Sequence, residues 1–403
     1  MTPDPQIPIA SNPMASQVAK RFAARLALFY AALFGLVGTH LPFFPVWLKA
    51  IGIDAAWIGI ITAVPSLTRF TVLPFITGLA EKRHALRHAI IATAIASAIG
   101  FAVIGTLNHP LAILLVYAVT ACLWTPMTPL TDAYALKGVS RYRLNYGPLR
   151  LWGSAAFVAG ALACGLLVDV IAARHLIWVI VAVAALGAII SFGLRPLEER
   201  GTGAKAPERA TALLRDPGFL AIIVAAALIQ GSHAAYYTFA SIAWQNAGLG
   251  GLTIAGLWVL GVVAEIVLFA LSPRFTLSPA TLVIIAALSA VARWAITAQE
   301  PPLEVLAIVQ LAHGSTFGLT QVGTMGLLVQ NAPPHMMARA QGYLTACTGI
   351  VTSLASVLSG AIYAQHGQGV YYLMAAMALV SAFVMWLARH RLRHYPQSDA
   401  SGG

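Results

Sequence analysis

Charged residues are scarce in this chain. Only 24 Lys and Arg and 13 Asp and Glu occur among 403 residues, so 9% of the sequence is charged, whereas soluble domains carry roughly 25%. This is too little charge to cover a water-facing surface of this size. The apolar fraction of 59% excludes a disordered chain, and the repeats of collagen or a coiled coil are missing. The remaining class is a protein whose outer surface faces lipid.

Cysteine is also rare, with three residues in the chain. Cys122, Cys164 and Cys347 lie inside long apolar stretches, and none belongs to a CxxC motif or a Cys/His cluster. We therefore expect no disulfide, no metal site and no cofactor. No P-loop, HExxH or GxSxG motif occurs in a suitable context, which argues against ATP-driven transport by this chain alone and against an enzyme.

Long apolar stretches dominate the sequence. A bilayer core about 30 Å thick is crossed by roughly 20 residues of helix. The first stretch is too long for a signal peptide, so we expect it to stay in the mature protein. Windows of this length predict twelve transmembrane helices at about 22–48, 54–80, 86–107, 110–136, 146–171, 174–194, 218–246, 252–272, 279–299, 302–331, 337–364 and 369–389.

A charged segment divides these helices into two groups of six. Residues 195–217 hold nine of the 37 charges, so this segment cannot cross a membrane. We predict an N-terminal bundle at 22–194, a cytoplasmic linker at 195–217 and a C-terminal bundle at 218–389, with loose cytoplasmic tails at 1–21 and 390–403. Two-bundle secondary transporters are built in this way, with a substrate site at the midplane between the bundles.

The basic residues alternate between loops on opposite sides of the predicted membrane. With a cytoplasmic N-terminus, 19 of the 24 Lys and Arg fall on the cytoplasmic side, and only Lys49 and Arg174 fall on the opposite side. This asymmetry predicts that both termini are cytoplasmic. It also indicates that the basic residues behind the net charge of +11 contact anionic lipid headgroups rather than nucleic acid.

Five charged residues stand out inside the predicted spans, where each charge costs on the order of 2.5–3.5 kcal/mol to insert at the centre. They have to face one another or a water-filled cavity. Arg69 is near the middle of its span, which favours a cavity. Asp132 and Arg150 form either a structural ion pair or a substrate clamp. Glu265 and Arg293 carry opposite charges deep in successive spans, and we expect a functional pair there.

Histidines and polar residues inside the spans add further candidates. His40, His233 and His313 are all intramembrane, and lone histidines of this kind are more often core groups than ligands. His313 opens the stretch HGSTFGLTQ, which is rich in Gly, Ser and Thr and ends at Gln321. This context favours a functional role for His313.

Aromatic residues in the spans 218–246 and 252–272 are the last candidates. Tyr236, Tyr237 and Trp258 could stack on a planar or sugar ring, although aromatic belts and packing are the commoner interpretation. The substrate-binding candidates are then Arg69, His40, Tyr236, Tyr237, Trp258, Asp132, Arg150 and Gln321.

Several stretches resemble a known family. The block Ser232–Phe275 (SHAAYYTFASIAWQNAGLGGLTIAGLWVLGVVAEIVLFALSPRF) is similar to two successive helices of the phenylpropionate permease family, a lactose-permease-like branch of the major facilitator superfamily. The resemblance implies twelve helices in two bundles and proton-coupled uptake of a small solute. Shorter similar stretches are FYAALFGLVGTHLPFFPVWLKAIG, YGPLRLWGSAAFVAG, ARW, LAHGSTFG and RAQGYL.

The resemblance also implies roles for individual residues. Lactose permeases carry a carboxylate one turn after a histidine that His313 matches, but this chain has Thr316 there. The resemblance therefore implies that Glu265 carries the coupling proton, with His313 as its partner and Arg293 nearby. The positions that match ionisable residues of lactose permeases are Asp132, Arg150, Glu265 and Arg293.

The sequence thus predicts an integral, multi-pass transporter, located in the inner membrane if the cell is bacterial and acting as a monomer. Three intramembrane Arg against two acids favour an anionic substrate, and the resemblance implies an aromatic carboxylate such as phenylpropionate. A neutral sugar or nucleoside taken up with a proton is the alternative, and export of drugs or metabolites is a third. A membrane sensor would need a soluble signalling domain, which is missing from this sequence.

Overall fold

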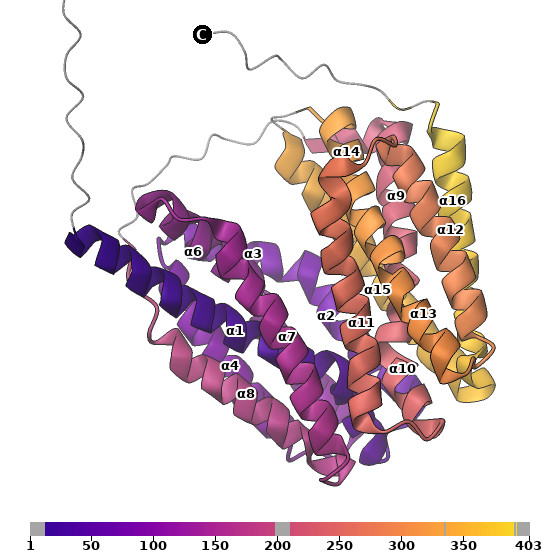
Figure 1. The fold of residues 1–403 in the computed structure, drawn as a ribbon, viewed down its shortest axis with the longest axis horizontal. Coiled ribbons are helices and arrows are strands. Elements are labelled where there is room, and N and C mark those ends of the chain that lie inside the picture. Colours follow the sequence, from indigo (N-terminus) through magenta and orange to yellow (C-terminus); the bar gives the residue numbers. More distant parts are fainter. Residues whose placement is uncertain (1–12, 198–209, 334–335, 391, 393–403) are drawn as a thin grey trace, which may run out of the picture.

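The computed structural model describes residues 13–197, 210–333, 336–390 and 392, and the regular structure in this part of the chain is helical. The helices form two bundles that meet along one face (Figure 1). The first bundle contains α1 (Pro13–Ala50), α2 (Ala55–Thr71), α3 (Leu73–Lys82), α4 (Leu86–Ile104), α5 (Pro110–Trp124), α6 (Met127–Tyr142), α7 (Tyr146–Val168) and α8 (Leu176–Ser191). The second contains α9 (Pro217–Gly231), α10 (Ala234–Asn246), α11 (Gly251–Leu271), α12 (Pro279–Thr297), α13 (Leu303–His313), the π-helix η4 (Gly314–Gly318), α14 (Leu319–Asn331), α15 (Met337–His366) and α16 (Val370–Ala388).

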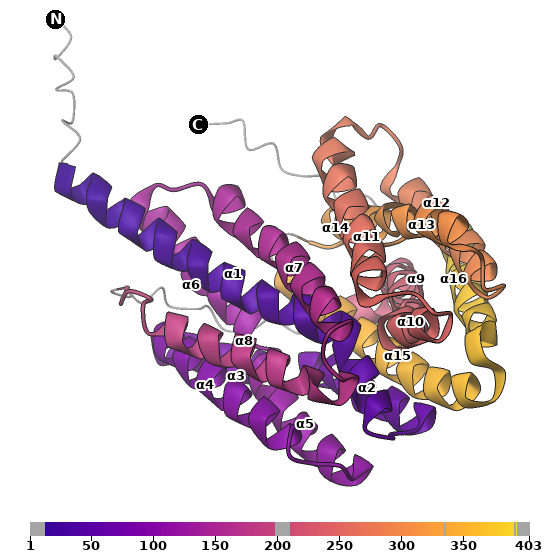
Figure 2. The ribbon, with the colours of Figure 1, turned by 60° about the horizontal axis from the view of Figure 1, so that its bottom comes forward.

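Ten helical stretches in the described residues are long and apolar enough to cross a bilayer, or eleven if α2 and α3, bent by 46°, form one span. The longest stretch, Met337–Ala388, has 52 residues, more than twice the roughly 20 that one span requires. Within it, α15 and α16 run as separate rods that meet at the 3₁₀ turn Gly367–Gly369 (Figure 2). Each predicted span coincides with a helix or with successive helices, but the count of twelve stays a prediction.

The first helix starts earlier than the sequence predicts. α1 begins at Pro13, well before the expected start at residue 22. The segment MASQVAKRFAARLALF that follows Pro13 is rich in good helix formers and contains no glycine, so the helix extends beyond its apolar part. The remaining predicted tail and linker residues 1–12, 198–209 and 393–403 lie outside the described residues.

Several helix starts follow from local capping chemistry. Asp54 accepts a backbone N–H from the third residue along the chain at 3.0 Å and caps α2. Asp216 caps α9 and Ser278 caps α12, and each is followed by a proline at the first helical position. Proline has no N–H to satisfy there and its backbone is already helical. These caps fix where the helices that carry the site begin.

Small residues let the two bundles approach closely. α2 packs on α15, and α7 packs on α11. A Cβ added to Gly59 would lie 2.7 Å from the Cα of Gly360, and a Cβ added to Gly165 would lie 2.6 Å from the carbonyl oxygen of Gly251. Both distances are too short for any side chain, so only glycine permits this spacing.

Several hydrogen bonds between the described parts of the bundles lie in the half of the molecule distant from residues 195–197 and 210–217, which flank the linker. The carboxylate of Asp169, just after α7, accepts the backbone N–H groups of Gly251 and Leu252 at 2.7 and 3.3 Å. Thr62 and Thr238 share a hydrogen bond of 3.1 Å between their hydroxyl oxygens. The buried residues of α11 all lie in its first half, and α7 and α11 diverge towards the linker end (Figure 1). The bundles are therefore joined at one end.

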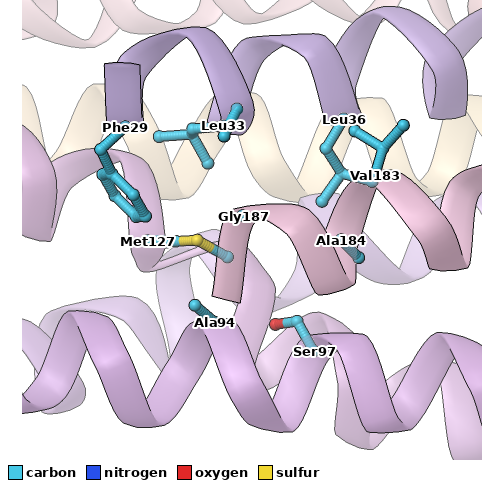
Figure 3. Close-up of a pocket in the computed structure, with 10 residues that line it drawn as sticks. Phe29, Leu33, Leu36, Ala94, Ser97, Met127, Val183, Ala184 and Gly187 are labelled. Carbon is cyan, nitrogen blue, oxygen red and sulfur yellow. The ribbon is translucent and has the colours of Figure 1, made fainter. Parts of the chain in front are cut away.

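The interior of the first bundle contains a small void of about 10 Å³ between α1, α4, α6 and α8 (Figure 3). Apolar side chains such as Phe29, Leu33 and Met127 line most of it. The Ser97 hydroxyl in its wall donates to a backbone carbonyl of its own helix at 2.7 Å. A space of this size holds at most one water molecule, so it is a packing gap and not a substrate site.

Candidate functional site

Arg293 on α12 is the centre of a buried polar network and exposes only 2% of its surface. Its Nη1 donates to Nδ1 of His313 and to Oγ1 of Thr316, both at 3.0 Å. Its Nη2 donates to Oε1 of Gln310 at 3.2 Å. These acceptors come from α13 and η4 and are uncharged, so the charge of Arg293 has to be balanced from further away.

His313 connects Arg293 to Glu265. A guanidinium can only donate, so Nδ1 of His313 accepts the bond from Arg293, and the neutral imidazole carries its proton on Nε2. This Nε2 lies 3.8 Å from Oε2 of Glu265 on α11. The sequence suggested a direct Glu265–Arg293 pair, but the imidazole lies between the two side chains. Gly261, which presents no side chain, lets His313 pack against α11.

His233, between α9 and α10, extends the network beyond Thr316. Its Nδ1 lies 2.9 Å from the carbonyl oxygen of Ile229, which only accepts, so Nδ1 donates. Its Nε2 then accepts from the hydroxyl of Thr316 at 3.2 Å. Thr316 thus accepts from Arg293 and donates to His233. A proton added to either histidine at its accepting nitrogen would break one of these bonds.

Glu265 faces the interface between the bundles. A quarter of its side chain is exposed. The charge of Arg150, on α7 of the other bundle, acts on the Glu265 carboxylate. Tyr237 lies within electrostatic range of Glu265, of Arg293 and of Arg69 on α2. The acid that the sequence singles out therefore lies beside the network of His313 and Arg293.

The aromatic candidates lie beside this network. The ring centroids of Tyr236 and Trp258 are 4.6 Å apart, and those of Tyr237 and Trp258 are 6.2 Å apart in a stacked arrangement. The indole N–H of Trp258 donates to the hydroxyl of Ser241 at 2.9 Å. Tyr236 and Trp258 are buried and pack the network, whereas Tyr237 is partly exposed.

A cavity of about 290 Å³ lies between the bundles, at the lower end of the roughly 300–1,000 Å³ of small-molecule sites. Arg69 is exposed and is the only charged residue among the described residues that line this cavity. Gln230, Gln321 and several threonines line the opposite wall. Among them, the hydroxyl of Thr324 is buried and has no hydrogen-bond partner in the described residues. This wall is therefore polar, and one of its hydroxyl groups has an unused hydrogen-bonding capacity.

Asp132 and Arg150 point to different partners. Oδ1 of Asp132 accepts the hydroxyl groups of Tyr30 at 2.6 Å and Tyr146 at 2.9 Å. The guanidinium carbon of Arg150 lies 3.8 Å from the ring centroid of Phe34. The ion pair considered from the sequence is not among their contacts in the described chain. The two tyrosines satisfy the acid, and Arg150 packs on aromatic rings of α1.

His40 lies in the core of the first bundle. Its Nε2 shares a hydrogen bond with the hydroxyl of Tyr117 at 3.1 Å, and its ring packs against Phe44 and Trp124 at centroid distances of 4.7 and 4.4 Å. Its Nδ1 has no partner in the described residues. His40 does not line the cavity, so the structure separates it from Arg69 and Gln321.

The sequence did not single out several residues of this site. Gln310, Thr316 and Phe317 all contact His313 or Arg293 directly. The signal that could have found them is a spacing of three or four residues between polar groups in an apolar span. That spacing places side chains on one helical face, and here it runs through Gln310, His313, Thr316, Thr320 and Thr324.

Comparison with known proteins agrees with this architecture. The profile of the MFS_1 like family matches residues 23–374. The chain is 33% identical over 375 residues to a "Probable 3-phenylpropionic acid transporter" of Escherichia coli. The matched region covers 89% of this chain and 96% of that protein. It is 25% identical over 374 residues to a "Maltose permease" of Geobacillus stearothermophilus, covering 91% of this chain and 94% of that one.

Solved structures share the fold at low sequence identity. The nucleoside transporter NupG has a TM-score of 0.81 at 16% identity, covering 91% of this chain and 99% of that one. A bacterial homologue of the human lysosomal transporter Spinster has a TM-score of 0.73 at 13% identity, covering 96% of this chain and 100% of that one. The chain therefore belongs to the MFS_1 like family of the major facilitator superfamily and is an integral, multi-pass membrane transporter.

Proposed function

We propose that this transporter imports a small aromatic carboxylate together with a proton, by alternating access, as a monomer in the cytoplasmic (inner) membrane of a bacterial cell. The observation that carries the proposal is that Arg69 is the only charge in the lining of the interbundle cavity. A guanidinium binds a carboxylate with two parallel hydrogen bonds. Phe317 in the same lining offers a ring face to the aromatic part of the substrate.

The proton would be carried by Glu265. A substrate anion at Arg69 and an ionised Glu265 repel each other across a water-poor cavity, so binding of the anion and binding of a proton favour each other. His313 is a poor carrier, because its Nδ1 is occupied by Arg293. When Glu265 is ionised, it balances the buried charge of Arg293 through the imidazole of His313.

Alternating access would proceed by rocking of the two bundles, each of six spans, with both termini in the cytoplasm. The interbundle hydrogen bonds of Asp169 and Thr62 lie at the end distant from the linker. Since the linker is predicted to be cytoplasmic, this arrangement corresponds to a transporter that is closed outside and faces inwards.

Binding of the acid and of its neutral amide tests the role of Arg69. We expect 3-phenylpropionate, but not 3-phenylpropionamide, to raise the thermal unfolding midpoint of the purified protein. Arg69→Gln should weaken acid binding by about tenfold or more, since hydrogen bonds to charged groups are worth about 1.5–3 kcal/mol. Arg174→Gln, at an exposed arginine outside the cavity, is the matched control. Equal shifts by acid and amide, or an Arg69→Gln variant that binds like the wild type, would contradict the proposal.

A neutral sugar or nucleoside is the second candidate substrate. The observation in its favour is the number of hydroxyl and amide groups in the cavity wall, among them Ser66, Gln230, Gln321 and Thr324. The relative described as a maltose permease supports it at 25% identity. The same thermal-shift assay with maltose and with uridine distinguishes a neutral substrate from an aromatic carboxylate. If maltose or uridine raises the unfolding midpoint and 3-phenylpropionate does not, the substrate is neutral.

A further inference from the structure

Phe317 belongs both to the cavity wall and to the surroundings of the buried histidines. Its ring stacks on the imidazole of His313, with centroids 5.4 Å apart and planes inclined by 17°. Its edge meets the ring of His233, with centroids 6.3 Å apart and planes at 81°. Phe317 is also among the residues that line the cavity containing Arg69. One side chain thus contacts both the cavity and the histidine next to Arg293 and Glu265.

The backbone around Phe317 is held against α11 on both sides of Glu265. Phe317 lies in the π-helix Gly314–Gly318, a rare widened turn that occurs mostly at functional sites. A Cβ added to Gly314 would lie 2.7 Å from the carbonyl oxygen of Ala264, and a Cβ added to Gly318 would lie 2.7 Å from the side chain of Leu268. The backbone beside Phe317 is therefore packed closely against α11, with no room for a side chain at either glycine.

The orientation of the His313 ring decides whether its Nε2–H points at Glu265. Three contacts hold that ring: the hydrogen bond from Arg293, the contact with Glu265 and the stacked face of Phe317. Arg293 and Glu265 belong to the proton pathway itself. Phe317 is the contact that a substrate in the cavity can touch.

We propose that Phe317 is the positioning residue that couples substrate binding to the Glu265–His313 pair. A substrate ring packed on the cavity face of Phe317 fixes the phenyl ring over His313 and keeps Nε2 directed at Glu265. Without a substrate the phenyl ring turns more freely, and the imidazole loses its alignment. This inference rests on the proposed function, since it requires that Glu265 carries the coupling proton.

The other charged and titratable groups around the pair come from every neighbouring element. Arg293 approaches from α12, His233 from the break between α9 and α10, and Tyr236 from α10 with its ring centroid 6.0 Å from that of His313. Tyr237 on α10 and Arg150 on α7 are the other such groups. None of these side chains is among the residues that line the cavity. Replacing Phe317 therefore changes the link to the substrate and leaves these groups in place.

Replacement of Phe317 by Leu and by Tyr separates ring stacking from simple bulk. The wild type and each variant are reconstituted in liposomes with labelled 3-phenylpropionate as the probe. Two rates are compared: accumulation driven by a pH gradient and counterflow exchange without a gradient, each corrected for protein-free liposomes. Phe383→Leu, at an exposed position of α16, is the matched control.

Because the Phe317 ring also contacts the substrate, we expect Phe317→Leu to lower both rates. Accumulation should fall about three- to tenfold more than exchange, the range that corresponds to one aromatic contact. Phe317→Tyr, which keeps the ring, should preserve the ratio of accumulation to exchange, and Phe383→Leu should keep both rates. A Phe317→Leu variant that accumulates like the wild type, or that loses exchange and accumulation in equal proportion, would overturn the inference. Wild-type protein that ignores the pH gradient would overturn the proposed function and this inference with it.

Discussion

Arg293 organises the site through the directions of its donors as well as through its charge. The planar guanidinium reaches His313, Thr316 and Gln310 at the same time, at 3.0–3.2 Å. The direction of its bond to His313 decides which nitrogen of the imidazole faces Glu265. A lysine would keep the charge but has a single nitrogen with a compact set of donors.

We therefore expect Arg293→Lys to lose at least two of these bonds and to destabilise the protein by about 2–4 kcal/mol. Proton-coupled accumulation should fall by about tenfold or more, because the His313 ring is no longer held. Unfolding in detergent and gradient-driven uptake in liposomes measure the two effects. A lysine variant with wild-type uptake would show that charge alone suffices at this position.

The sequence predicted only part of this arrangement. The insertion cost of intramembrane charges is sufficient to single out Glu265, Arg293 and Arg69. The same reasoning treated Glu265 and Arg293 as a direct pair, because the place of His313 depends on the missing side chain of Gly261 on a neighbouring helix. Such a contact between distant segments leaves no trace in local composition.

At the scale of elements, the contact between α7 and α11 is the most specific join between the bundles. Asp169 accepts two backbone N–H groups at the start of α11, where the helix dipole also favours a negative charge. Glycines at 165 and 251 bring the two helices close enough for these bonds. Loss of the carboxylate should loosen this end of the molecule.

We expect Asp169→Asn to increase the rate of amide hydrogen exchange in the first turn of α11 by about two- to tenfold. The reason is that a negative charge at a helix N-terminus stabilises the helix by about 0.3–1 kcal/mol, and by up to ~2 kcal/mol in favourable geometry. Exchange measured by mass spectrometry on a peptide that covers Gly251 and Leu252 gives the result. The first turn of α12, capped by Ser278, is the internal control. Unchanged exchange at Gly251 would exclude Asp169 as a clamp between the bundles.

Element boundaries show why some features escaped prediction. The apolar windows placed the helices correctly because about 20 apolar residues are needed to span a bilayer. The π-helix at Gly314–Gly318 and the bend between α2 and α3 were not predicted. A widened turn or a bend leaves the hydropathy of a span unchanged, so both arise from packing against neighbours such as α11.

At the scale of the whole molecule, charged residues are scarce, so few groups could couple the binding of a substrate to the binding of a proton. Within the described residues, Arg69 is the only charge that lines the cavity, and Glu265 is the acid next to the buried arginine network. The charged segment 195–217 predicts a division into two groups of helices, because it cannot enter the bilayer. Which intramembrane groups meet in the folded chain, as His313 and Glu265 do, depends on the tertiary fold.

The most direct test of the account is gradient-driven uptake of labelled 3-phenylpropionate into liposomes that contain the wild type or Glu265→Gln. The protonated acid crosses lipid by itself, so initial rates are taken and protein-free liposomes are subtracted. With a gradient of one pH unit, one coupled proton supports up to about tenfold accumulation. We predict that a protonophore abolishes the protein-dependent accumulation, and that Glu265→Gln, whose amide cannot release a proton, retains exchange but not accumulation. Protein-dependent accumulation that persists with the protonophore, or at the wild-type level in Glu265→Gln, would contradict the account.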